Sequence, residues 1–339
     1  MADSKRCVRD GCKTSALTMS DSCWEHIQDK DAYAEKIKNI FTDDADLKGA
    51  NFEKAVLRNI RATRVNLSGA NLSQADLSGA HLFDTDFQHA HLLGVNLSSS
   101  DLTHCDFRGA DMTRADLSGA RLWNANLMNA ALAEADISCA DFWNANLHNV
   151  KIWRANFENA KALTRRNFAS DPHLIWTSKI SEEGILSAEE AYRGLKSHFL
   201  TTGMYDDSGW ASFKEKTMER LLLKRKKDLR YIPSLMMGML CGYGEKPARI
   251  IATAFSTILF YSVLYYLLNA VTSSGSGSYL MSASDYLYYS TVTFTTVGYG
   301  DFVPKANAFF RLLAASEAFI GAFLMGLFVF TLARKYSAR

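Results

Sequence analysis

Two groups of residues in this chain combine types and spacings that could hold an ion. The first is the run Thr295-Thr296-Val297-Gly298-Tyr299-Gly300-Asp301. Gly298 and Gly300 can adopt left-handed backbone conformations without a steric cost, so successive carbonyl groups can point toward a common axis. The carbonyl oxygens of residues 296–299 and the Thr296 hydroxyl could then replace the water around a dehydrated cation. One loop supplies one oxygen to each ring of ligands, so a closed ring needs several copies of the chain.

The second group lies near the N-terminus, where Cys7, Cys12, Cys23 and His26 offer four soft ligands within 20 residues. Three thiolates and one imidazole form a common tetrahedral donor set for Zn²⁺. We expect a structural zinc knuckle, because four protein ligands leave no coordination position open. The alternative is three unrelated thiols in the cytosol. The other cysteines are expected to be packing residues: Cys105, Cys139 and Cys241.

Composition argues against some classes of function. The chain of 339 residues has 38 basic and 36 acidic side chains and a formal net charge of +2. This balance argues against a polyanion-binding protein and against an acidic mimic of nucleic acid. The first thirty residues are polar and contain no apolar signal-peptide core, so we expect the N-terminus to stay in the cytosol.

A repeat with a period of five occupies the first half of the chain, in the form Ala-(Asp/Asn)-(Leu/Phe)-x-x. Its large central residues recur in steps of five from Leu47 to Phe157, which gives 23 repeats without an insertion. Such a period matches neither a helix, with about 3.6 residues per turn, nor a strand, with a period of about two. It fits a square coil in which the central residue and the small residue two positions before it both point inward.

These motifs resemble the pentapeptide-repeat family. The resemblance implies a right-handed quadrilateral β-helix with coils about 4.8 Å apart. Each coil is stabilised mainly by its neighbours, so both ends need a cover, which residues 1–44 and 161–180 can provide. We interpret the repeats mainly as a rigid spacer. Mimicry of DNA, a property of some members, needs an acidic surface, whereas residues 45–164 hold 13 acidic and 11 basic side chains.

Helical spacing replaces the period of five after the repeats. The segment Ser187-Ala-Glu-Glu190 has the form of a capping box and predicts that a helix begins there. Gly203 and the run 205–208 break the pattern before a second amphipathic stretch, so we expect a helical hairpin. A basic block at 224–230 follows. The next apolar segment, Ile232 to Leu240, is too short to span a bilayer and is expected at the membrane interface.

Two stretches are long and apolar enough to cross a membrane. Residues 250–271 are 22 consecutive uncharged residues, about 33 Å as a helix. Residues 309–333 form the second stretch, which contains Arg311 and Glu317. Lys and Arg are concentrated before the first stretch and after the second, so the positive-inside rule places both termini in the cytoplasm. We expect a two-pass protein of a prokaryotic cell (inner) membrane.

The region from Arg249 to Arg339 resembles the two-transmembrane class of potassium channels, with the Thr-Val-Gly-Tyr-Gly-Asp run between its spans. The resemblance implies a homotetramer that conducts K⁺ passively and has no enzymatic activity. Residues 285–295 would be the pore helix, whose C-terminal dipole favours a cation. The selectivity filter would consist of Thr296, Val297, Gly298, Tyr299 and Gly300. Its expected supports are Asp301, Tyr288, Tyr289 and Glu317.

The second span carries the residues expected to gate the pore. Gly321 would be its hinge, with Gly326 as the rival position, and the inner mouth would lie near Phe330 and Ala333. Glu317 is an intramembrane acid, which is usually functional or paired. It either braces the pore helix or lines the ion path.

The sequence thus predicts a multidomain chain: a right-handed quadrilateral β-helix, a helical linker, and an all-α channel domain with two spans and a pore helix. The predicted parts are a cap (1–44), a solenoid (45–164), a linker and juxtamembrane segment (165–248) and a pore domain (249–339). The predicted associates are K⁺ as permeant ion, Zn²⁺, the lipid bilayer and other copies of the chain. No nucleic-acid partner is expected. Two alternatives stay open: a membrane-anchored interaction scaffold, and a less selective cation channel.

Overall fold

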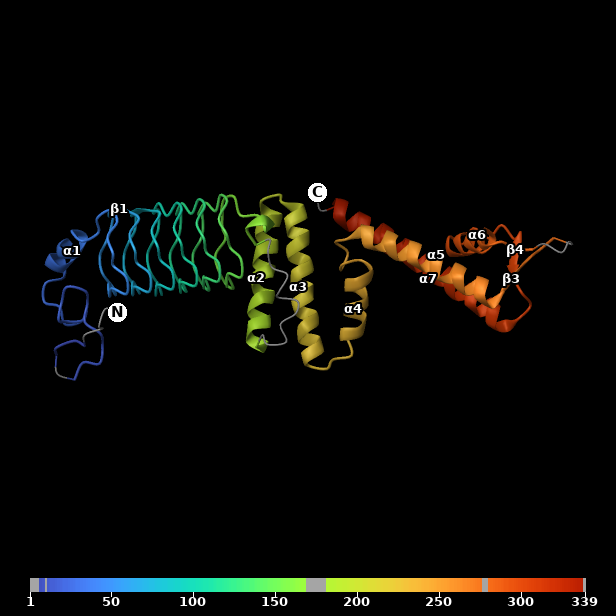
Figure 1. The fold of residues 1–339 in the computed structure, drawn as a ribbon, viewed down its shortest axis with the longest axis horizontal. Coiled ribbons are helices and arrows are strands. Elements are labelled where there is room, and N and C mark those ends of the chain that lie inside the picture. The colour runs from blue at the N-terminus through green and yellow to red at the C-terminus, as the bar shows by residue number, and fades with distance from the viewer. Residues whose placement is uncertain (1–5, 10, 169–180, 276–279, 338–339) are drawn as a thin grey trace. The chain divides into compact units, whose positions relative to one another are not determined.

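The structure, a computed structural model, describes residues 6–9, 11–168, 181–275 and 280–337, with side chains as far as Ala333. The chain divides into two compact units, Met1–Leu222 and Leu223–Arg339. The first contains a stack of coils and the helices α1 and α2 with most of α3, and the second contains α4 to α7 with two short strands (Figure 1).

The pentapeptide repeats form coils of twenty residues, so four repeats complete one coil (Figure 1). Parallel bridges join positions twenty residues apart, as between Asp46 and Asn66. Strand β1 (Arg61–Thr63) pairs with β2 (His81–Phe83) in the same register. As predicted, the central residues and the small residues two positions before them form the buried interior.

In most repeats an Asp or Asn precedes the central residue, and its side chain stabilises a corner of the coil. The Asn66 side-chain oxygen accepts a hydrogen bond from the Ser68 backbone N–H at 3.1 Å, and Asn71 accepts one from Ser73 at the same distance. Two residues after each central residue the backbone is left-handed, as at Asn59 (φ 55°). The turn leaves a backbone N–H outside the hydrogen bonds between coils, and the short side-chain oxygen of Asp or Asn accepts from it. This explains why Asp or Asn recurs at this position of the repeat.

The first coil is covered by the segment that precedes it. Helix α1 (Lys30–Lys38) places Ile37 in the interior, and Leu17 joins the same buried cluster. Backbone and side-chain hydrogen bonds connect the cover to the coil: Thr18 N–H donates to the Asn51 carbonyl at 2.8 Å, and Asn51 N–H donates to the Thr18 hydroxyl oxygen at 2.7 Å.

The other end of the coils is closed by the 3₁₀ helix η1 (Arg165–Phe168). The Asn167 side-chain amide donates to the carbonyl oxygens of Ala145 at 2.8 Å and Phe142 at 3.2 Å, so it satisfies exposed acceptors of the last coil. Of the cover predicted at 161–180, residues 169–180 lie outside the described part of the chain.

Two helices follow, α2 (Glu182–Thr201) and α3 (Tyr205–Arg225). The predicted start of the first helix was wrong: Ser181 is the N-cap, and its hydroxyl oxygen accepts from Gly184 N–H at 3.1 Å, so Ser187 lies inside α2. The predicted break at 205–208 was also wrong. These residues form the first turn of α3, where the acidic side chains lie favourably at the positive end of the helix dipole.

The described residues of the second unit form four helices and a two-stranded antiparallel sheet: α4 (Tyr231–Leu240), α5 (Pro247–Leu268), β3 (Val271–Ser273), α6 (Ala283–Phe294), β4 (Phe302–Pro304) and α7 (Ala308–Ser337). Among the described residues, α5 and residues 308–333 of α7 are long and apolar enough to cross a membrane. The first span was predicted to extend to residue 271. It ends earlier because Asn269 is left-handed (φ 45°) and caps α5.

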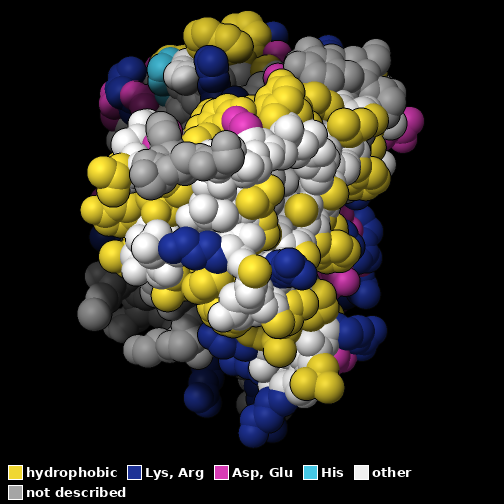
Figure 2. Space-filling view, turned by 90° about the vertical axis from the view of Figure 1, so that its right-hand side faces the viewer, with side chains coloured by type: hydrophobic (Ala, Val, Ile, Leu, Met, Phe, Trp, Pro, Cys, Tyr) yellow, Lys and Arg dark blue, Asp and Glu magenta, His cyan; other side chains and the backbone are white. Residues whose placement is uncertain are grey.

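The surface of the second unit is strongly apolar. Figure 2 looks from the side on which α6 and β4 lie in Figure 1, and apolar side chains cover much of that face. Large apolar side chains on α5 and α7 are exposed to 70% or more: Phe255, Leu267, Leu312 and Phe319. An exposed surface of this kind agrees with helices that face lipid.

Candidate ion-conduction and metal sites

The candidate filter follows directly from the C-terminus of α6. Three alternate residues of the run are left-handed: Thr296 (φ 57°), Gly298 (φ 58°) and Gly300 (φ 79°). The sequence predicted this conformation at the two glycines and missed it at Thr296, because a β-branched residue rarely adopts it. Backbone hydrogen bonds hold the turn, since Thr296 N–H donates to the Thr293 carbonyl at 3.0 Å. Successive carbonyl groups can point toward a common axis when the backbone alternates in this way.

The whole run 295–301 is exposed in a single chain, although it includes large side chains. Val297 is 52% exposed and Tyr299 is 72% exposed. A Cβ atom added at Gly298 or Gly300 would meet no atom within 4 Å. The loop therefore lies beside open space within one chain, and further copies of the chain could fill that space.

Hydrogen bonds and ring packing attach the C-terminal end of the run 295–301 to residues in and beside the two-stranded sheet. Ser274 donates to the Asp301 carbonyl oxygen through its backbone N–H at 2.9 Å and through its hydroxyl at 3.1 Å. The Tyr288 ring packs edge-on against Phe302, with ring centroids 5.9 Å apart, and lies close to Asp301. Tyr289 is buried and packs against Tyr265 at 5.1 Å, so within one chain it contacts α5 instead of the filter run.

Glu317 is fully buried between the three helices of the second unit. One carboxyl oxygen accepts a hydrogen bond from the Tyr265 hydroxyl of α5 at 2.7 Å, and the other lies against the Ser290 hydroxyl of α6. The carboxyl group thus joins α5, α6 and α7. Sequence reasoning missed both partners. Both are polar residues in otherwise apolar segments, and this is only a weak indication that they bind a buried carboxyl group.

Counting protons constrains this network. The Ser290 hydroxyl also lies 2.9 Å from the Ile258 carbonyl oxygen, and a hydroxyl group has one proton to donate. The Ser290 hydroxyl can therefore make a full hydrogen bond to only one of these two oxygens at a time.

The two glycines considered for the hinge differ in their surroundings. A Cβ atom on Gly321 would lie 1.9 Å from the backbone carbonyl oxygen of Phe294, the last residue of α6. A Cβ atom on Gly326 would meet no atom within 4 Å. Gly321 is therefore required for the close approach of α6 and α7. Further along α7, Phe330 and Ala333 are exposed in the single chain.

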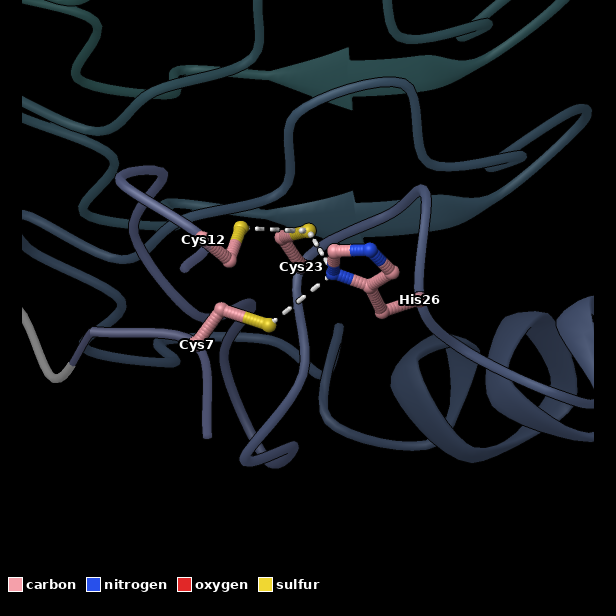
Figure 3. A group of neighbouring side chains, drawn as sticks. All are labelled: Cys7, Cys12, Cys23 and His26. Carbon is pink, nitrogen blue, oxygen red and sulfur yellow. Dashed lines mark hydrogen bonds between the residues drawn. The ribbon is translucent and has the colours of Figure 1, made fainter. Parts of the chain in front are cut away.

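The N-terminal cluster has the geometry of a metal site. The ligand atoms of Cys7, Cys12, Cys23 and His26 all lie within 4.8 Å of one another and point toward a common centre (Figure 3). The Cys7 and Cys23 sulfurs lie 3.3 Å and 3.4 Å from Nδ1 of His26, and the Cys12 and Cys23 sulfurs are 3.8 Å apart. The edges of a tetrahedral Cys₃His zinc site are about 3.5–3.8 Å. The cluster could therefore bind a metal ion.

The surroundings of Cys23 favour its ionised form. Burial alone would raise its pKa, but hydrogen bonds from Thr14, the Glu25 backbone, Cys7 and Cys12 lower the pKa of Cys23 to about 6. A thiolate at neutral pH is the form that binds metal ions.

Comparison with known protein families finds one match in each of the two compact units. Residues 252–338 match the ion channel family, and residues 43–79, 80–119 and 125–161 match the pentapeptide repeat family in eight copies. The chain therefore combines pentapeptide repeats with an ion channel domain. Neither of these families consists of enzymes.

A curated relative of the chain is a potassium channel. The chain is 40% identical over 73 residues to two pore potassium channel b of Oryza sativa subsp. japonica. The match covers 22% of this chain, and the chain spans only 18% of the length of that relative.

The chain is also similar to solved structures of pentapeptide repeat proteins. HetL, a pentapeptide repeat protein involved in heterocyst differentiation regulation from the cyanobacterium Nostoc sp. strain PCC 7120, is 32% identical, with a TM-score of 0.24. The match covers 35% of this chain and 60% of HetL. Rfr23 from the cyanobacterium Cyanothece 51142 is 22% identical, with a TM-score of 0.24, and the match covers 38% of this chain and 95% of Rfr23.

Proposed function

We propose that this chain is one protomer of a homotetrameric, potassium-selective channel. One observation carries the proposal: the run 295–301 alternates left-handed and ordinary backbone and lies exposed beside open space in the single chain. Four such loops around an axis would supply stacked oxygen rings from Thr296 to Tyr299, which replace the hydration shell of K⁺. Cyclic symmetry closes such an assembly with one loop per chain.

The outer part of the run 295–301 favours a K⁺-selective channel over a less selective cation channel. Tyr299 and Gly300 complete the outer ion sites in channels of this kind, and the chain has both. The similarity to a potassium channel supports the same ion.

The channel domain would cross the membrane twice. We place α5 and α7 as the spans, both termini in the cytoplasm and the protein in a prokaryotic inner membrane, on the strength of the basic residues that flank the spans. The pore would open and close by movement of α7 at Gly321 or Gly326, with its inner mouth near Phe330 and Ala333. Asp301, Tyr288 and Tyr289 would support the filter from the side, and Glu317 would brace the pore helix.

Flux measurements test this proposal. The purified protein is reconstituted in liposomes, and K⁺ flux is measured with Ba²⁺ as blocker and Na⁺ as the comparison ion. Gly298→Ala should abolish K⁺ flux, because Gly298 has φ +58° and an L side chain strains that backbone.

Gly49→Ala is the matched control. Gly49 has φ +65° with no atom within 4 Å of an added Cβ, which is similar strain at a corner of the solenoid. It should leave flux unchanged. A silent but correctly assembled tetramer would support the scaffold alternative, and equal Na⁺ and K⁺ fluxes would support the less selective channel.

The first unit would serve as a rigid structural or regulatory domain. We propose that its coils form a right-handed quadrilateral β-helix between a cap (1–44) and a linker (165–248), with the pore domain at 249–339. Regulation of the pore would pass through the linker, because it connects the two domains along the chain.

We further propose that Cys7, Cys12, Cys23 and His26 bind one Zn²⁺ ion that holds the cap together. The segment 7–26, which holds the four ligands, also contains Leu17 and Thr18, which cover the first coil. Its Glu25 pairs with Lys54 of the coils. Closing this loop on a metal ion would stabilise its folded form.

Metal analysis of the purified chain tests the zinc proposal. Cys7→Ser should lose most of the bound zinc and increase hydrogen exchange at residues 16–34, while Cys139→Ser, an exposed cysteine outside the cluster, should retain it. Zinc-free wild-type protein with a protected cap would contradict the proposal.

A further inference from the structure

A surface on the second unit combines basic and apolar side chains that no other described part of the unit covers. Lys224, Arg225, Lys226 and Lys227 are consecutive and exposed. Arg230 is also exposed, and it pairs at 2.7 Å with Asp228, the single acidic side chain of residues 224–230. Leu229, Ile232, Met236 and Met239 follow at helical spacing and are 82%, 57%, 55% and 65% exposed. We call these nine side chains the α4 surface: 224–227, 229, 230, 232, 236 and 239.

The opposite face of α4 is fixed against the start of the first span. Gly238 is buried, and its carbonyl oxygen accepts a hydrogen bond from Nη1 of Arg249 at 2.9 Å. Cys241 follows α4 directly and lies in a buried cluster with Ile250 of α5. The apolar side chains of the α4 surface therefore point away from the packing face, and rotation of α4 to bury them would break these contacts.

The position of this surface identifies what covers it. α4 ends at Leu240 and α5, the first candidate span, begins at Pro247, so the α4 surface is continuous in the chain with a membrane-spanning helix. A short amphipathic helix with basic residues at one end is suited to the boundary between headgroups and acyl chains. Its charge is opposite to that of anionic lipids, which attract basic residues beside a span.

We infer that the α4 surface binds anionic phospholipid in the leaflet at the N-terminal end of α5. Leu229, Ile232, Met236 and Met239 insert among the acyl chains, and the basic residues at 224–227 contact the phosphate groups. This inference rests on the proposed use of α5 as a span, and it is independent of ion selectivity. The two methionines of this face are flexible and can adapt to an irregular lipid surface.

A lipid titration tests the electrostatic part. The full-length protein in neutral detergent is heated with increasing phosphatidylglycerol, and the concentration that gives half of the increase in Tm is measured. Replacing residues 224–227 by Gln should raise this concentration at least tenfold, because each basic residue near an anionic surface contributes about fivefold in affinity.

Matched variants and ligands sharpen this test. Gln at four exposed basic positions of the first unit should leave the titration unchanged: Lys48, Arg61, Lys151 and Arg166. Phosphatidylcholine should give a much smaller increase in Tm, and high salt should weaken the response to phosphatidylglycerol. An unchanged midpoint in the 224–227 variant would overturn the inference. An equal response to glycerol phosphate would also overturn it, because the ligand would then be a soluble phosphate.

Depth measurement tests the insertion. In a Cys139→Ser background, a bimane label on Met236→Cys should be quenched by brominated acyl chains in phosphatidylcholine–phosphatidylglycerol liposomes. The control label on Leu93→Cys, an exposed apolar position of the coils, should not be quenched. No quenching at position 236, or disulfide cross-linking of this residue between protomers, would show that protein covers the α4 surface. Neither readout requires conduction, so a silent channel leaves this test intact.

Discussion

Glu317 is a buried carboxyl group in a membrane-spanning helix, where an ionised side chain without partners would cost several kcal/mol. Its partners, Tyr265 and Ser290, come from two other helices, so the group connects all three elements around the filter run. Side chains that act in this way determine how precisely α6 is held relative to α5 and α7.

Two substitutions of Glu317 show whether the protein needs the charge of this side chain or only its hydrogen bonds. Glu317→Gln should retain stability and K⁺ flux, because an amide can donate to Ser290 and accept from Tyr265. Glu317→Ala should destabilise the protein by about 2–5 kcal/mol, because it leaves the buried Tyr265 hydroxyl without its partner and a cavity between helices. Tm and flux of both variants provide the measurement. Equal damage in the two variants would mean that the protein needs an ionised Glu317.

The two glycines of α7 provide a second comparison at this scale. Gly321→Ala should destabilise the protein by about 1–3 kcal/mol or more, because its Cβ would overlap the Phe294 carbonyl oxygen. Gly326→Ala should be neutral or stabilising by up to about 1 kcal/mol, because alanine is the better helix former and the space is open. Tm values distinguish packing from hinge motion: a pure hinge role for Gly321 predicts altered opening with unchanged Tm.

At the scale of elements, α2 and α3 close the C-terminal side of the first unit. Glu215 of α3 pairs with Arg193 and Lys196 of α2 at 3.0 Å and 3.2 Å. Burial alone would raise the pKa of Glu215, but these ion pairs hold it below its usual value. His198 of α2 packs against Phe157 of the last repeats, with ring centroids 6.2 Å apart.

This junction should weaken in mild acid. Burial lowers the pKa of His198 from 6.5, outweighing a backbone hydrogen bond at Phe157 that raises it. A depressed pKa means that the unfolded state binds more protons, so the stabilisation is complete above about pH 6.5 and falls as pH drops through the folded pKa. The Glu215 contribution is lost only at lower pH, below about 4.5.

Hydrogen exchange of α2 between pH 7 and 5, corrected for the intrinsic pH dependence of exchange, measures this effect. His198→Gln keeps a side-chain donor for the Phe157 backbone and removes the titration, so its protection should not depend on pH in this window. A wild-type junction that remains equally protected at pH 5 would contradict the prediction.

At the scale of the whole molecule, the proposed function depends on association. Large apolar side chains of α5 and α7 and the entire filter run are exposed in one chain. Cross-linking of the protein in lipid bilayers should give a ladder that ends at four protomers, because four loops are needed to close each oxygen ring. Particles of one or two protomers, active in K⁺ flux, would refute this arrangement.

The sequence by itself determined the features that depend on local or periodic patterns. A period of five can bury one side-chain pair per repeat only in a coil with a corner every five residues, so the solenoid could be predicted without any long-range contact. The glycines at 298 and 300 and the spacing of Cys7, Cys12, Cys23 and His26 are equally local, because short loops bring such groups together.

The tertiary structure alone decided which residues meet across helices. Gly321 and Gly326 are the same residue type five positions apart in one helix, and only the approach of Phe294 distinguishes them. Tyr265 and Ser290 lie 52 and 27 residues before Glu317, and no sequence spacing relates them. Such contacts depend on how helices cross and rotate, which is set by the packing of the whole unit and not by any segment within it.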